Sequence, residues 1–194
     1  MPDLVLRGGR PWGFDGPADV LVSDGAIAQI GALPDRPGGE VIDISGRLVL
    51  PGFVDSHCHL DKTLYGGAWI PHTAGDALAD RIANERRRRR ELGLPDVDRM
   101  TALLERMVAA GTSYVRTHTD VDPEVGLDGI AAVAAVAHRF ADGITVEQVA
   151  FPQSGILTSP GTAELIEEAL NSGVGTVGGI DRPRRRRPRP GSTP

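Results

Sequence analysis

Four short apolar segments alternate with helix-like segments after Gly52, and this alternation constrains the fold more than any other feature. The apolar segments have the length of buried strands, and the segments between them show the period of helices. Strands that alternate with helical crossovers form a parallel sheet, either open and doubly wound or half of a (β/α)8 barrel. We predict strands over 53–59, 113–119, 144–151 and 174–180, and helices over 76–91, 100–108, 128–140 and between an N-cap at Ser159 and Gly173.

The first fifty residues have a different pattern, with short strands separated by turns. Alternating apolar residues next to Asp24-Gly25 and Ser45-Gly46 are typical of tight turns in an antiparallel sheet. We therefore predict a small antiparallel β-domain over 1–50, ahead of a strand and helix region over 51–180. Its strands are expected over 4–7, 19–22, 26–30, 41–44 and 48–50.

The composition is that of an ordinary globular protein, with 40% hydrophobic and 24% charged residues. The sequence has no apolar run near the roughly 20 residues of a membrane span, and its first ten residues lack the layout of a signal peptide. One cysteine cannot form an internal disulfide, so a reducing cytoplasm is the expected location.

Arginine is concentrated in two stretches. Arginines fill positions 86–90 of a predicted helix, which we interpret as a solvated helix face. Six arginines, four prolines and one aspartate lie within 181–194, and this composition predicts a disordered tail with a charge of +5. Because the whole chain carries −5, the remainder carries −10, which argues against nucleic acid as a partner.

His57 and His59 flank the single cysteine at the end of the first predicted strand. Side chains alternate along a strand, so the two imidazoles are expected on one face and Cys58 on the other. Two histidines at the carboxyl end of a strand can bind one metal ion, with metal–nitrogen distances of about 2.0–2.1 Å. Burial at a turn is the alternative explanation of the pair.

The sequence around these histidines, ISGRLVLPGFVDSHCHLDKT (44–63), resembles the amidohydrolase superfamily, in which His-x-His ends the first barrel strand. Three later segments resemble successive parts of bacterial cytosine deaminase and related hydrolases: YVRTHTDVDPE (114–124), QVAFPQSGIL (148–157) and ELIEEALNSGVGTVGGI (164–180). This resemblance implies the N-terminal half of a (β/α)8 TIM-type barrel after the small β-domain. It also implies hydrolytic deamination of a cyclic amidine, a small heterocyclic substrate.

The same resemblance implies roles for individual residues. His57 and His59 match the first two ligands of a catalytic divalent metal ion, zinc or iron, and Gln153 matches a glutamine that binds the amide edge of the substrate. Gln153 could instead face water. His118 either lines the substrate pocket or is a core histidine bonded to carbonyl groups, and Asp61 either supports the metal histidines or caps a turn. His72 and His138 are expected to be structural.

The resemblance also shows what the sequence lacks. Binuclear members bridge two metals with a lysine on the fourth strand, but the only lysine is Lys62, so a mononuclear site is expected. The family's third histidine, catalytic glutamate, later histidine and aspartate ligand would follow Ile180, which leaves the metal incompletely ligated. A truncated, non-catalytic fragment or interaction protein is therefore the alternative function. We expect weak metal binding, no deamination by the isolated chain, no membrane partner, and self-association of the half barrel.

Overall fold

The computed structural model describes residues 3–34, 39–71 and 73–179, so the predicted tail and His72 lie outside the described residues. The chain divides into two compact units, Met1–Pro51 and Gly52–Pro194. Among the described residues, no helix is long and apolar enough to cross a membrane.

The first unit is a small mixed β-sheet. It is built from β1 (Leu4–Pro11), β2 (Ala18–Ser23), β3 (Ala26–Gly31), β4 (Glu40–Asp43) and β5 (Leu48–Val49). Strands β1, β2 and β3 form the predicted antiparallel meander, but β4 and β5 pair with β1 in parallel. The prediction of a purely antiparallel sheet is wrong for these two strands, because the connection after β3 returns the chain to the starting end of β1.

The turn between β2 and β3 follows from its sequence. Asp24 and Gly25 have φ angles of 51° and 78°, the left-handed conformation that a two-residue hairpin of this kind requires. Asp and Gly tolerate this conformation better than β-branched residues do. Val5 of β1 and both Val20 and Leu21 of β2 are buried apolar side chains of this unit.

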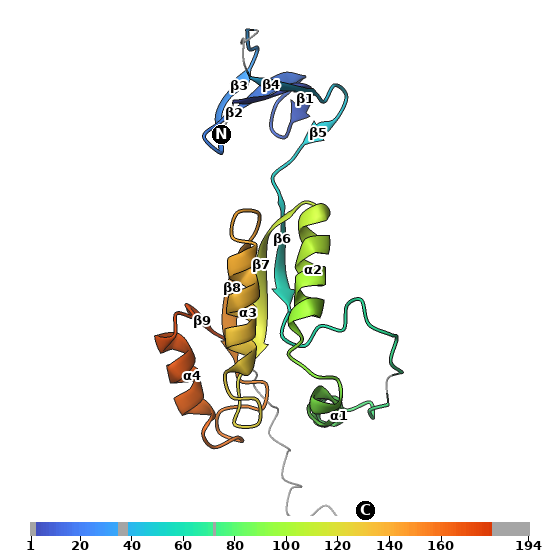
Figure 1. The fold of residues 1–194 in the computed structure, drawn as a ribbon, viewed down its shortest axis with the longest axis vertical. Helices are drawn as coiled ribbons and strands as arrows, with labels where there is room; N and C mark the ends of the chain where they lie inside the picture. The colour runs from blue at the N-terminus through green and yellow to red at the C-terminus, as the bar shows by residue number, and fades with distance from the viewer. Residues whose placement is uncertain (1–2, 35–38, 72, 180–194) are drawn as a thin grey trace, which may run out of the picture. The chain divides into compact units, whose positions relative to one another are not determined.

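The second unit is a four-stranded parallel sheet whose strands lie in chain order (Figure 1). Its strands are β6 (Phe53–Cys58), β7 (Thr112–Asp120), β8 (Thr145–Phe151) and β9 (Thr176–Val177). Helices α2 (Val97–Ala109), α3 (Asp128–Arg139) and α4 (Thr162–Asn171) connect successive strands, and α1 (Leu78–Glu91) precedes α2. Strands in chain order, without a reversal point, agree with half of a barrel and not with a doubly wound sheet.

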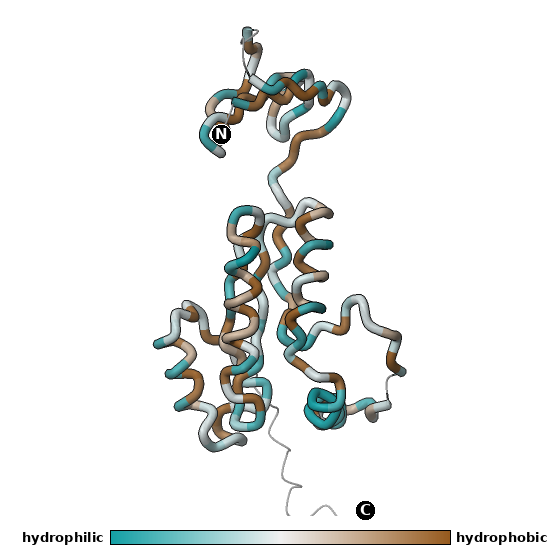
Figure 2. The backbone as a smooth tube through the Cα atoms, viewed as in Figure 1, coloured by the Kyte–Doolittle hydropathy of each residue, from teal (hydrophilic) through white to brown (hydrophobic). Residues whose placement is uncertain are grey.

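The core of this unit lies between the sheet and the connecting helices. One apolar cluster joins β7, α2 and α3 around Val115, Leu104 and Val133, and a second joins α3, β8 and α4 around Ala150 and Ile166. Helix α1 contributes to neither cluster and is mostly hydrophilic (Figure 2). The three connecting helices therefore cover one face of the sheet.

The end of α2 agrees with the prediction from the sequence, whereas the start of α4 differs from it. Gly111, with φ of 89°, follows the end of α2 as predicted. Helix α4 begins at Thr162 and not after Ser159, because Gly161 has φ of 92°, which no α-helical residue adopts. Strand β9 is also shorter than predicted, with Ile180 outside the described residues.

Candidate metal centre and substrate pocket

Three histidine rings meet at the carboxyl edge of the parallel sheet. His57 lies on β6, His59 follows it, and His118 lies on β7. The His57 and His59 ring centroids are 5.3 Å apart, and the His57 ring stacks on His118 with centroids 4.1 Å apart. Cys58 packs instead against the apolar cluster on the helix side. The predicted alternation of His57, Cys58 and His59 is therefore confirmed.

The His59 ring is fixed by the neighbouring strand. Its Nδ1 lies 2.7 Å from the backbone oxygen of His118, and because a carbonyl oxygen only accepts, Nδ1 carries the proton. The other ring nitrogen, Nε2, is then the one with a lone pair for a metal ion. Burial and the positive charge of Lys62 lower the pKa of His59, which favours the neutral ring that metal binding needs.

These histidines suit a metal ion, but they supply only part of a complete set of ligands. His57 and His59 would hold it, since both rings lie on one face and His59 is held by a carbonyl group in the manner usual for metal ligands. Among the described residues, no group of three or more His, Cys, Asp and Glu side chains is placed to bind a metal. The metal role of the pair stays a prediction.

His118 lies against His57 on the face away from the helices. Its Nδ1 is buried and has no hydrogen-bond partner among the described residues, which speaks against a carbonyl bond at this nitrogen. Burial and the neighbouring His57 lower the pKa of His118. Its contact with a substrate stays a prediction.

Gln153 lies near the same edge, just beyond β8. The ring of Phe151 is 6.4 Å from that of His59 and 5.6 Å from that of His118, measured between centroids. The Gln153 backbone N–H donates to the Phe151 oxygen at 2.9 Å, which closes a tight turn directly after the strand. Gln153 is thus two residues from an aromatic side chain that contacts the histidines, while its role in substrate binding stays a prediction.

A closed group of two cations and two carboxylates lies beside His59. Lys62 Nζ contacts Glu85 at 3.0 Å and Asp120 at 3.2 Å, and Arg89 contacts the same two carboxylates. Asp120 is almost fully buried at the end of β7. Burial alone would lower the pKa of Lys62, but Asp120 and Glu85 outweigh it and raise the pKa, so the ammonium stays charged. We call these four residues the ion ring.

Asp61 supports the ion ring and not the histidines. Its Oδ2 accepts a hydrogen bond of 3.1 Å from the backbone N–H of Asp120, whereas the buried Oδ1 has no partner among the described residues. Burial, and then the charge of Asp120, raise the pKa of Asp61 to about 6. Both sequence interpretations of Asp61 are therefore wrong, since its side chain neither contacts a metal histidine nor caps the following turn.

A second ionic group attaches α1 to the loops after β7 and β8. Arg86 contacts Asp122 at 3.2 Å and also donates to Ser154, whose hydroxyl donates to Asp122 at 2.6 Å. Arg90 contacts Glu124 at 2.7 Å. The predicted solvated face over 86–90 is thus wrong at Arg86 and at the buried Arg89. No periodic pattern in the sequence indicates these pairs, whose members lie more than thirty residues apart.

Two cavities border the ion ring. The larger, about 470 Å³, is lined by His59, Lys62 and residues of α1, with Leu64, Ile70 and Pro71 as apolar walls. The smaller, about 170 Å³, is lined by Asp61, Asp120 and Arg86 among others. Arg89 of the ion ring and Leu94 line both cavities. Only the larger includes a candidate metal ligand.

Known proteins resemble this chain over most of its described length. The N-isopropylammelide isopropylaminohydrolase of Burkholderia multivorans has a crystal structure with a TM-score of 0.84 at 38% identity, covering 92% of this chain and 45% of that one. The 5-methylcytosine deaminase of Klebsiella pneumoniae gives 0.69 at 29% identity, covering 91% and 43%. In these comparisons the second unit matches the N-terminal part of the amidohydrolase TIM-barrel fold, as predicted.

The sequence comparison agrees with the structural one. The N-isopropylammelide isopropyl amidohydrolase of Pseudomonas sp. (strain ADP) is 31% identical over 187 residues, 92% of this chain and 45% of that protein. This chain thus spans less than half the length of that relative. A model of the amidohydrolase family matches residues 40–182, which include the His-x-His strand and all three connecting helices. The chain belongs to the amidohydrolase family.

Proposed function

We propose that this chain forms the metal-binding and substrate-binding part of a hydrolase that cleaves C–N bonds in small nitrogen heterocycles. The observation that carries the proposal is the gathering of His57, His59 and His118 at the carboxyl edge of the sheet, where barrel enzymes place their active sites. His59 also lines a cavity of about 470 Å³, a volume suited to a single substituted ring.

The side chains around His59 have complementary tasks in this proposal. A divalent metal ion held by His57 and His59 would supply hydroxide by lowering the pKa of a bound water to about 7. Gln153 would hold the amide edge of the ring, because a carboxamide offers both a donor and an acceptor. The Lys62 ammonium, kept charged by Asp120 and Glu85, would bind a ring oxygen or an anionic ring.

The relatives support this class of substrate. Their names refer to N-isopropylammelide and to 5-methylcytosine, which are nitrogen heterocycles carrying an exocyclic amine. For this chain we propose hydrolytic removal of such an amine, with zinc or iron as the metal. The alternative of a non-catalytic interaction protein is not favoured, because the match includes the His-x-His strand and the segment around Gln153.

Metal binding tests the proposal without requiring turnover. Calorimetric titration of the purified chain with Zn²⁺ at neutral pH should show one weak site, because two imidazoles leave the remaining positions of the ion to water. His57→Ala and His59→Ala should each weaken that site by at least tenfold. His138→Ala is the matched control, since this exposed histidine on α3 lies outside the histidine group, and it should bind like the unaltered chain. Equal binding by all three variants would contradict the proposal.

A further inference from the structure

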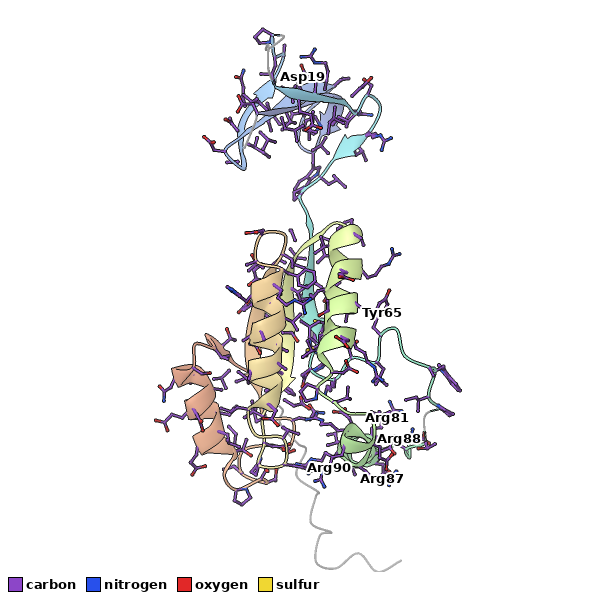
Figure 3. All side chains as sticks on the ribbon, in the orientation of Figure 1. Asp19, Tyr65, Arg81, Arg87, Arg88 and Arg90 are labelled. Atoms are coloured by element: carbon purple, nitrogen blue, oxygen red, sulfur yellow. The ribbon has the colours of Figure 1, made fainter. Side chains whose placement is uncertain are left out.

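Helix α1 carries arginines on two sides, and their surroundings differ. On one side Arg86 and Arg90 contact the carboxylates of Asp122 and Glu124, so their charges are compensated. On the other side Arg81 and Arg88 line the cavity of about 470 Å³ that His59 also lines. Arg88 lies seven positions after Arg81, which places both on one side of a helix. Figure 3 shows the two labelled side chains at α1.

Neither of these two arginines has an acidic partner within the described part of the chain. Arg88 donates to the hydroxyl of Thr73, a neutral acceptor, at 3.0 Å, and none of the ion pairs between described residues involves Arg81 or Arg88. This hydrogen bond to a neutral hydroxyl does not neutralise the Arg88 guanidinium. Both guanidinium groups therefore keep donors available for a ligand.

The residues that line the cavity carry a net positive charge. Lys62, Arg81, Arg88 and Arg89 line it, whereas Glu85 is the one carboxylate among its lining residues, all of which are described. Within the ion ring, Asp120 and Glu85 balance Lys62 and Arg89, which leaves the charges of Arg81 and Arg88 uncompensated. A concave surface lined by one sign of charge concentrates the opposite ion.

We propose that Arg81 and Arg88 form an anion subsite of this cavity, which accepts a carboxylate carried by the heterocyclic substrate. This inference rests on the proposed function, because the same cavity holds the ring next to His59. Planar guanidinium groups bind carboxylates through paired hydrogen bonds, a geometry that favours them over a single point charge. The apolar walls at Leu64, Ile70 and Leu92 would contact the ring itself.

Three probes separate the contributions of ring and charge. Orotate is a pyrimidine that carries a carboxylate, uracil is a similar ring without it, and inorganic phosphate is a compact anion without a ring. Calorimetry on the purified chain should show orotate binding about tenfold tighter than uracil, or more, since a charge-assisted pair is worth about that factor. In the double variant Arg81→Gln/Arg88→Gln the two rings should bind equally. Tighter binding of phosphate than of orotate would support the anion subsite but assign it to a phosphoryl group.

Arg87→Gln is the matched control. Arg87 lies on the same helix, donates to Asn84 and does not line the cavity, so its loss removes one charge from α1 without altering the subsite. This variant should keep the preference for orotate. An equal loss of preference in Arg87→Gln, equal affinity for orotate and uracil in the unaltered chain, or no binding of orotate would each overturn the inference. Failure of the zinc titration alone would instead overturn the proposed function.

Discussion

The two faces of the parallel sheet differ in what they contain. On the face covered by α2 and α3, Val115, Thr117 and Thr119 of β7 are fully buried. On the opposite face of the same strand, Tyr114, Arg116 and His118 alternate with them and point away from the helices. A single strand therefore supplies a fully buried layer on one side and polar, titratable groups on the other.

We therefore expect the covered face to contribute most to the stability of the fold and the opposite face to carry the groups that can take part in chemistry. The covered face gains its free energy from burial of apolar area, whereas the opposite face holds Glu147, which accepts hydrogen bonds from Tyr114 and from Arg116 at 2.9 Å. Barrel interiors are usually filled by bulky branched side chains, so a polar layer of this kind is a departure from the common pattern. Substitutions on the two faces are expected to have different effects, and three experiments measure that difference.

The largest effect on folding is expected from the covered face. Leu104→Ala removes a fully buried side chain from the cluster between β7, α2 and α3, and should lower the free energy of unfolding by about 2–5 kcal/mol. Val54→Ala on β6 is the control, because Val54 pairs with Tyr114 and is 64% exposed. It should change stability by less than about 0.5 kcal/mol in urea unfolding. Equal losses in the two variants would remove the contrast between the faces.

An intermediate effect is expected at the ion ring, whose Asp120 ends β7. Asp120→Asn leaves Lys62 and Arg89 with Glu85 as their remaining carboxylate. The free energy of unfolding should therefore fall by about 1–3 kcal/mol. Glu124→Gln removes an exposed carboxylate that pairs with Arg86 and Arg90 of α1. It should lower the free energy of unfolding by no more than about 1 kcal/mol. Chemical denaturation of both variants in one buffer gives the comparison, and a larger loss for Glu124→Gln would contradict it.

The smallest effect is expected from the polar face and should appear only in acid. Hydrogen bonds from Tyr114, Arg116 and Thr176 lower the pKa of Glu147 from 4.5 to about 2. A carboxyl group whose pKa is lower in the folded state stabilises the fold above its unfolded pKa, and this contribution is lost as pH falls toward 2. Glu147→Gln should therefore flatten the dependence of stability on pH between about 4.5 and 2.

Glu168→Gln is the control for that pH series. Glu168 is exposed on α4 and has no ion pair among the described residues, so the variant should follow the unaltered chain. Thermal unfolding recorded at each pH measures both variants. If Glu147→Gln and the unaltered chain lost stability in parallel below pH 4.5, the hydrogen bonds of Glu147 would make no difference to folding.

The arrangement of the second unit could be predicted because it depends on local patterns. The apolar period of α2 and the strand pattern of β7 are each readable within about ten residues, and Gly111 marks the end of a helix. The position of β4 was not predictable in the same way. Whether a strand pairs in parallel or antiparallel depends on where its connection returns the chain, and no local period records that.

The candidate site was predictable in part for the same reason. Strand alternation places His57 and His59 on one face, and the resemblance to a family adds their proposed role. The ion ring was missed, because Lys62 and Asp120 lie 58 residues apart and the arginines over 86–90 look like an ordinary charged helix. Contacts between charged groups that are distant in sequence leave no pattern in one sequence.

Helix α1 is attached to the sheet in a way that sets it apart from α2 and α3. Ile82 is its buried apolar residue among the side chains described, whereas Arg86, Arg89 and Arg90 hold it through carboxylates. Dissolved ions screen such contacts, most strongly where they are exposed, while the cost of dehydrating charges falls as temperature rises. Salt and heat therefore act differently on α1 than on α2 and α3. Salt weakens the ion pairs that attach α1, the wall of the larger cavity, whereas warming favours these ion pairs relative to the apolar clusters that hold α2 and α3.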